Sequence, residues 1–151
     1  MEEKVAKRAA YIENLNAQIL SGKFVPNRDN GVQMRSLASQ TKYYSIVGGS
    51  NEQTLFFYDV SPSGFYSFVF KLYNDASSEE DAEFDVYAVN SDGTIGTHLA
   101  GQVNEIHPGS SKSTYVLSST YLGPDFAVIV ENDGWWWDTD VQITGRVVCN
   151  E

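Results

Sequence analysis

The stretch from Phe126 to Ile143 constrains the fold more than any other part of the sequence. Phe126–Val130 is apolar at every position, which is typical of a strand covered on both faces. Asn132-Asp133-Gly134 tolerates the left-handed backbone of a tight turn. Apolar residues then alternate with mostly polar ones as far as Ile143. The stretch therefore predicts two antiparallel strands joined by a turn.

The same alternation and turn signals recur through the chain and predict a mainly β protein. We expect an antiparallel two-sheet β-sandwich, jelly-roll or immunoglobulin-like, with an N-terminal α-helix. The predicted strands are 42–47, 53–60, 64–73, 83–89, 95–100, 113–118, 125–131 and 136–148. The predicted core residues are Phe68, Phe70, Phe84, Val86, Phe126, Val128, Val141 and Ile143. Residues 1–31 would form a helix and linker arm, and residues 32–151 the sandwich domain.

Glu2 to Ser21 has the spacing of an amphipathic helix, and Gly22 is a candidate C-cap. Its apolar stripe is narrow and is formed by Val5, Ile12, Leu15 and Ile19. Such a seam can pack on the helix's own sandwich or on a neighbouring subunit, and three heptad-spaced positions do not decide between the two. In the second case these four residues form an assembly arm, and a chain lacking residues 1–31 would keep a folded β domain.

Charge divides the chain into two unequal parts. Residues 1–42 carry seven Lys/Arg and four Asp/Glu, a net of +3, whereas residues 43–151 carry three and sixteen, a net of −13. An acidic body argues against nucleic-acid binding, which requires cations at the phosphates. The basic segment could contact its own acidic body or a neighbour's, or remain a solvated tail.

Several classes of protein are not expected. No apolar run approaches the roughly 20 residues that a membrane helix needs. No apolar block follows Lys4, Lys7 and Arg8, so we expect no signal peptide here, which leaves cytoplasmic synthesis or a virion. Cys149 is alone, which excludes a disulfide within the chain and a zinc site built on several cysteines.

Catalysis and a cofactor are not expected, because His98 and His107 belong to no recognisable catalytic motif. Calcium is the one candidate ion, since carboxylates cluster at Asp133, Asp138 and Asp140, and again at Glu79–Glu83. Neither cluster has the spacing of an EF-hand loop. The alternative is a polar outer strand face beside a solvated loop, with no metal bound.

The run Trp135-Trp136-Trp137 is the most specific local feature. On a strand, Trp135 and Trp137 would share the core face with Ile143, and Trp136 would share the outer face with Asp138 and Asp140. We therefore expect Trp136 at a contact surface, where aromatic rings among acids can stack on sugars or anchor a protein interface. The alternative is that all three rings are buried.

Phe84–Gly93, Phe126–Val130 and Val141–Gly145 together resemble secreted jelly-roll and pre-peptidase-type sandwich modules. The resemblance implies a sandwich fold and carries no functional residue across. Two functions remain. The first is a non-enzymatic structural or assembly subunit, of the virion, phage-particle or protein-shell type, forming a homo-oligomer or larger assembly. The second is a carbohydrate-binding module whose glycan site is Trp135–Trp137 with Asp133, Asp138 and Asp140.

Overall fold

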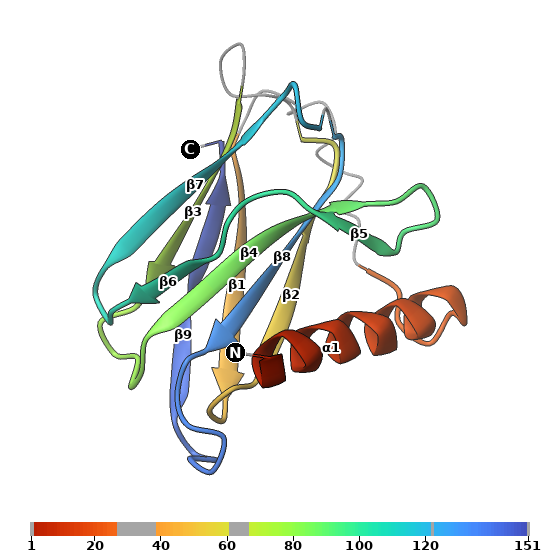
Figure 1. The fold of residues 1–151 in the computed structure, drawn as a ribbon. Helices are drawn as coiled ribbons and strands as arrows, with labels where there is room; N and C mark the ends of the chain where they lie inside the picture. The colour runs from red at the N-terminus through yellow and green to blue at the C-terminus, as the bar shows by residue number, and fades with distance from the viewer. Residues whose placement is uncertain (1, 27–38, 61–66, 122, 151) are drawn as a thin grey trace.

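The fold is a β-sandwich of two antiparallel sheets with one helix on an outer face (Figure 1). It comes from a computed structural model that describes residues 2–26, 39–60, 67–121 and 123–150. The described elements are α1 (Glu2–Leu20), β1 (Gln40–Val47), β2 (Glu52–Phe57), β3 (Ser67–Asn74), β4 (Ala82–Val89), β5 (Ile95–His98), β6 (Val103–Ile106), β7 (Ser111–Leu117), β8 (Phe126–Asn132) and β9 (Gln142–Cys149). The predicted fold class is confirmed.

The strands form two sheets with non-sequential neighbours. Sheet A has the order β1-β9-β3-β7. Sheet B has the order β2-β8-β4-β5, and β6 also pairs with β4. Strand β6 is not among the predicted strands; it has only four residues, of which Val103 and Ile106 are apolar. The expected domain boundary at 31/32 and the start of the predicted strand 64–73 lie outside the described residues.

The main core lies between the sheets and is built largely from phenylalanines. The ring centroid of Phe126 on β8 lies 4.8 Å from that of Phe68 and 5.1 Å from that of Phe70, both on β3. Seven of the eight predicted core residues are buried. Val141 is the exception: it precedes β9 and is half-buried.

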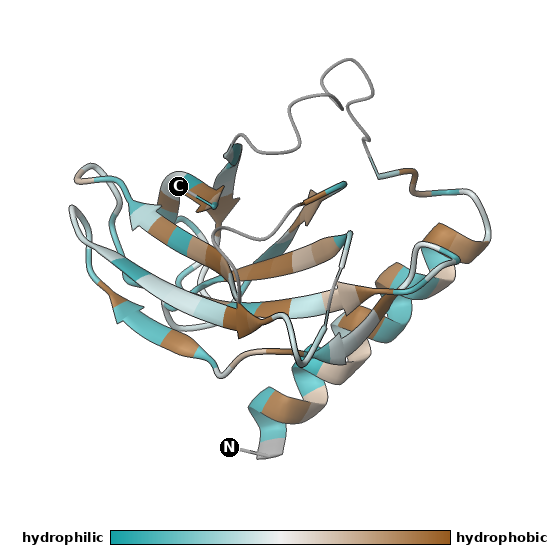
Figure 2. Cartoon of the chain, turned by 90° about the horizontal axis from the view of Figure 1, so that it is seen from above, coloured by the Kyte–Doolittle hydropathy of each residue, from teal (hydrophilic) through white to brown (hydrophobic). Residues whose placement is uncertain are grey.

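Strand β8 is buried on both faces, as its apolar sequence predicts. Val128 faces the main core, while Ala127 and Ile129 belong to a second apolar cluster on the outer face of sheet B. That second cluster is covered by α1, which brings Leu15 against it. Figure 2 shows hydrophobic positions spaced along α1 where the helix lies against the sheet.

The helix forms as predicted and ends one residue early, at Leu20. Gly22 follows with φ of +81°, a left-handed conformation that glycine adopts without a steric penalty, and its N–H donates to the Ile19 carbonyl at 3.2 Å. Within the described residues, α1 does not have the length and apolar character needed to cross a membrane.

Candidate binding surface

The segment between β8 and β9, residues 133–141, presents its three tryptophans to solvent; we call it the tryptophan loop. The exposed fractions of Trp135, Trp136 and Trp137 are 65%, 72% and 58%. Trp135 and Trp137 stack with their ring centroids 4.8 Å apart and their planes 8° from parallel. Trp136 meets Trp137 edge-on, with centroids 5.5 Å apart. The result is one contiguous aromatic cluster at one end of the sandwich.

The prediction that Trp135 and Trp137 point into the core is wrong, whereas Trp136 is exposed as expected. The predicted strand 136–148 begins only at Gln142, which pairs with Val47. Between the end of β8 and Gln142 the chain turns, and the Asp138 N–H donates to the Trp135 carbonyl at 2.9 Å. Strand alternation therefore does not apply to the tryptophans.

Buried hydrogen bonds fix the base of the tryptophan loop. The side-chain Nδ2 of the fully buried Asn132 donates to the carbonyls of Ile46 (3.2 Å) and Val141 (3.0 Å). Its side-chain oxygen accepts from the Gly134 N–H at 3.0 Å. This arrangement joins both ends of the loop to β1. The backbone conformation is thereby preorganised, which lowers the entropy lost when the rings bind a partner.

The backbone of the β1–β2 turn also approaches the loop closely. The Gly49 N–H donates to the Asp138 carbonyl at 3.0 Å. A side chain at position 49 would place its Cβ 2.0 Å from the Trp135 carbonyl oxygen, so only glycine fits. In the sequence, Gly48-Gly49 indicates only a turn. Its contact with the tryptophans depends on tertiary structure.

The expected acidic group of Asp133, Asp138 and Asp140 does not form as a single cluster. Asp138 and Asp140 are exposed on the tryptophan loop. Asp133 instead joins Glu83 and Glu131, and ligand atoms of these three carboxylates lie within 4.8 Å of one another. Of the second predicted cluster, Glu79–Glu83, only Glu83 belongs to this group.

The ammonium group of Lys4 lies among these three carboxylates. Its Nζ is 2.9 Å from Glu83, 3.8 Å from Glu131 and 3.8 Å from Asp133. A protein cation thus stands where a metal ion would neutralise the cluster. The expectation of no cofactor, with calcium as the one candidate, remains a prediction.

Three glutamates lie side by side across sheet B. The strand register places Glu52, Glu131 and Glu83 in one row across β2, β8 and β4. Their side chains are between 2% and 6% exposed. Like charges directly opposite each other destabilise a sheet, so this row requires cations.

Helix α1 supplies those cations. Arg8, whose side chain is 12% exposed, pairs with Glu52, with Glu131 at 3.2 Å and with Asp85 at 2.7 Å. Lys7 pairs with Glu52 at 3.2 Å. Burial, followed by the charge of Glu83, still raises the pKa of Glu131 to about 7 and that of Asp133 to about 6.

The residues predicted to form an assembly arm are used mostly within the chain. Leu15 is buried against sheet B, and Ile12 and Ile19 pack beside it, whereas Val5 is 67% exposed. Of the two arrangements that the sequence left open, the helix packs on its own sandwich, and the assembly role of these residues stays a prediction. The physical reason is that both its apolar stripe and its cations find complementary groups there.

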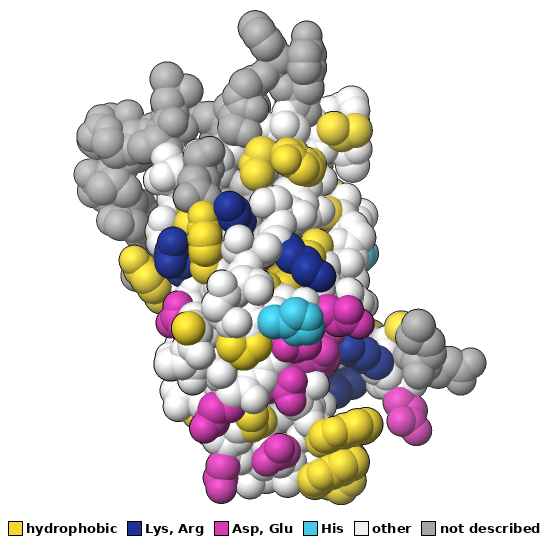
Figure 3. Space-filling model, turned by 90° about the vertical axis from the view of Figure 1, so that its left-hand side faces the viewer, with side chains coloured by type: hydrophobic (Ala, Val, Ile, Leu, Met, Phe, Trp, Pro, Cys, Tyr) yellow, Lys and Arg dark blue, Asp and Glu magenta, His cyan; other side chains and the backbone are white. Residues whose placement is uncertain are grey.

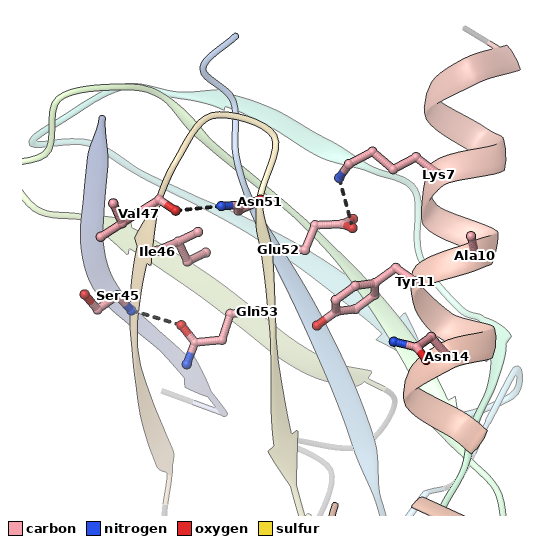
Figure 4. Close-up of a pocket in the computed structure, with 10 residues that line it drawn as sticks. All are labelled: Lys7, Ala10, Tyr11, Asn14, Ser45, Ile46, Val47, Asn51, Glu52 and Gln53. Carbon is pink, nitrogen blue, oxygen red and sulfur yellow. Dashed lines mark hydrogen bonds and ion pairs between the residues drawn. The ribbon is translucent and has the colours of Figure 1, made fainter. Parts of the chain in front are cut away.

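A groove of about 590 Å³ runs between α1 and the ends of β1 and β2 that are joined by residues 48–51 (Figure 4). Several of its polar side chains are bonded within the chain. Glu52 pairs with Lys7, Gln53 accepts from the Ser45 N–H at 3.0 Å, and Asn51 donates to the Val47 carbonyl at 2.7 Å. The groove is therefore a less suitable binding surface than the exposed aromatic rings.

The two histidines each bond an aspartate. His98 Nε2 lies 3.0 Å from Asp85, which also binds Arg8, so this pair belongs to the α1 contact. His107 Nδ1 lies 2.8 Å from Asp81 on the exposed side.

Comparisons with known proteins give no family. No protein-family model matches the sequence, and no curated protein is similar enough to match. Solved structures with a similar arrangement include a Bacillus endospore appendage, described as a disulfide-linked pilus, at 15% identity over 74% of this chain and 82% of that one, with a TM-score of 0.38. The Tobacco streak virus coat protein is 14% identical over 72% and 84% of the chains, with a TM-score of 0.36. A cellulose-specific carbohydrate-binding module is 10% identical over 74% and 70%, with a TM-score of 0.33. These values are too low to place the chain in any of the three groups.

Proposed function

We propose that this protein is a non-enzymatic structural subunit that assembles with other protein subunits, as in a virion, phage particle or other protein shell. The observation that carries the proposal is the exposure of Trp135, Trp136 and Trp137, each more than half accessible. Exposed apolar clusters of this kind mark interaction sites, and tryptophan is enriched among the residues that dominate binding energy. The fixed base of the loop favours a contact made without rearrangement.

The N-terminal helix takes part in assembly only by exchange. Because α1 is docked on its own sheet, docking on a neighbour means replacing that neighbour's helix with the same contacts, including Arg8 to Asp85. Such an exchange buries no surface beyond what the helix already buries in its own chain. The tryptophan loop is therefore the main contact in this proposal. The helix remains the second route to assembly.

Light scattering and sedimentation of wild type and Trp136→Ala test this proposal. We expect the wild type to form a large particle and Trp136→Ala to weaken each contact by about 2 kcal/mol, or roughly 30-fold in Kd. Val25→Ala is the control, because Val25 is 78% exposed and lies far along the chain from the loop. A variant at Trp136 that assembles like the wild type would refute the role of the loop.

Carbohydrate binding is the second candidate, favoured by the carboxylates of Asp138 and Asp140 beside the exposed rings. Aromatic faces can stack on sugar rings while carboxylates accept bonds from the hydroxyls. A glycan array and titration with the glycans that bind would detect it. If the wild type stays monomeric and binds a glycan, and Trp136→Ala loses that binding, carbohydrate binding replaces assembly as the proposed function.

A further inference from the structure

The two sheets carry opposite charges in their strands. The four strands of sheet A contain four Lys/Arg and no Asp or Glu. The five strands of sheet B contain five Asp/Glu and no Lys or Arg. Because residues 43–151 have only three Lys/Arg in all, every cation of this acidic body lies on a sheet A strand.

The outer side of sheet A combines these cations with aromatic rings. The register places Tyr43, Arg146 and Tyr73 in one row across β1, β9 and β3. The guanidinium carbon of Arg146 lies 3.9 Å, and Lys71 Nζ 5.0 Å, from the centroid of the Tyr73 ring. Tyr115, on β7, points to the same side. We call these five residues the cationic face.

The cationic face is accessible at its margins. Tyr43 is 73% exposed and Tyr115 is 60% exposed. The one described helix covers sheet B instead. Figure 3 looks onto the side that carries β7 and β3: some Lys and Arg lie in the upper half among hydrophobic side chains, others lie lower at the right edge beside acids, and Asp and Glu lie mainly in the lower half.

The tryptophan loop has the complementary chemistry. Residues 133–141 include Asp133, Asp138 and Asp140 and no Lys or Arg, and Asp138 and Asp140 are exposed beside the rings. Tryptophan is the best aromatic partner for a guanidinium or ammonium group, and carboxylates pair with both. The tryptophan loop therefore carries the aromatic rings and carboxylates that the cationic face would bind.

We propose that the tryptophan loop of one copy docks on the cationic face of a second copy. This inference rests on the proposed assembly function and identifies the partner surface. Asp138 and Asp140 pair with Arg146 and Lys71, and the tryptophan rings pack against Tyr43 and Tyr115. Because the two surfaces are different regions of the chain, the contact is head-to-tail and gives rings or open filaments.

Single substitutions separate the two surfaces. Arg146→Glu disables the cationic face, and Trp136→Ala disables the loop. By sedimentation velocity we expect each variant alone to be monomeric, with the association constant reduced at least about tenfold, as for a truncated interfacial hot spot. Lys112→Glu is the matched control: it makes the same charge change on sheet A, but Lys112 is tied to the Asn104 carbonyl at 2.8 Å.

Mixing the two disabled variants gives the decisive result. Trp136→Ala keeps an intact cationic face and Arg146→Glu keeps an intact loop, so an equimolar mixture should form a one-to-one heterodimer that cannot grow further. Circular dichroism checks that both variants are folded. Lys71→Glu replaces Arg146→Glu if the latter is not.

The outcomes distinguish the two proposals. Assembly of Arg146→Glu or Lys71→Glu at wild-type affinity, or a mixture that stays monomeric, overturns docking on the cationic face. If Trp136→Ala also loses assembly in that case, the loop remains the contact and its partner surface lies elsewhere. Wild-type assembly by Trp136→Ala refutes the assembly role of the loop itself.

Discussion

The outer sides of the two sheets are built on the same plan with opposite chemistry. On sheet B a row of three glutamates crosses β2, β8 and β4, and α1 covers it with Lys4, Lys7 and Arg8. On sheet A a row of Tyr43, Arg146 and Tyr73 crosses β1, β9 and β3 and is partly exposed. One charged face is thus satisfied within the chain, whereas the other is partly exposed and, in our proposal, binds a second copy.

Removing α1 is the most severe way to test this difference. Deleting residues 2–20 would expose Phe56 and Ile129 and leave the glutamate row without its cations. We expect loss of cooperative unfolding or aggregation, because unpaired buried charges and exposed apolar surface act together. The sequence alone predicted a folded β domain after deletion. A soluble truncated chain with a cooperative thermal transition would restore that prediction.

The inner and outer sides of sheet A should respond very differently to truncation. Phe70 is fully buried and Tyr43 is 73% exposed. Phe70→Ala should lower the free energy of unfolding by about 3–5 kcal/mol, as other large core truncations do. Tyr43→Ala should lower it by less than about 0.5 kcal/mol. Urea denaturation measures both, and similar losses would mean that the cationic face is part of the folded core.

The stability of the folded protein should depend on pH through the glutamate row. Burial, followed by the charge of Glu83, raises the pKa of Glu131 in the folded protein to about 7, whereas the carboxyl has its ordinary pKa of 4.5 in the unfolded chain. The folded state thus binds more protons between these values, so this contribution is fully present below about pH 4.5 and is lost as the pH rises through 7.

Glu131→Gln should remove that dependence. We expect its unfolding free energy to vary between pH 5 and pH 8 by about 1–2 kcal/mol less than that of the wild type. The exposed Glu13 on α1 gives the control Glu13→Gln. Urea denaturation at both pH values is the measurement, and an unchanged slope in Glu131→Gln would show that the row is neutralised in another way.

The tryptophans should matter little for stability. Trp135→Ala and Trp137→Ala each remove an exposed ring and one stacking contact, so each should cost about 1 kcal/mol or less. Thermal melting of the single variants, with Phe70→Ala as the buried reference, measures this. A loss of several kcal/mol would return these rings to the core side that strand alternation predicted.

Helix, strands and core were predictable because burial follows a local period. The apolar run of β8 indicates a strand buried on both faces, and the alternation around Phe68 and Phe70 indicates which face of β3 is buried. The tryptophan loop was not predictable in this way. Its conformation depends on the buried Asn132 side chain bonding Ile46, a residue 86 positions away, which no local pattern encodes.

The charged surfaces were likewise hidden in the sequence. Acids adjacent in the sequence, such as Asp138 and Asp140, suggested a cluster that does not form. The row that does form joins Glu52, Glu83 and Glu131, which only the strand register brings together. The excess of cations in residues 1–42 and of acids in residues 43–151 indicated that the two parts could attract each other. It could not show that these contacts form within one chain.

The same substitution made at the outer sides of both sheets, on α1 over sheet B and on β9 of sheet A, tests the central claim most directly. Arg8→Met should lower the free energy of unfolding by about 3–5 kcal/mol, because it removes the one cation that contacts Glu52, Glu131 and Asp85 together and leaves these buried carboxylates undercompensated. Arg146→Met should leave that free energy nearly unchanged and instead prevent assembly. Urea denaturation combined with sedimentation velocity measures both effects. A stable Arg8→Met together with an unfolded or fully assembling Arg146→Met would contradict the assignment of one face to folding and the other to binding.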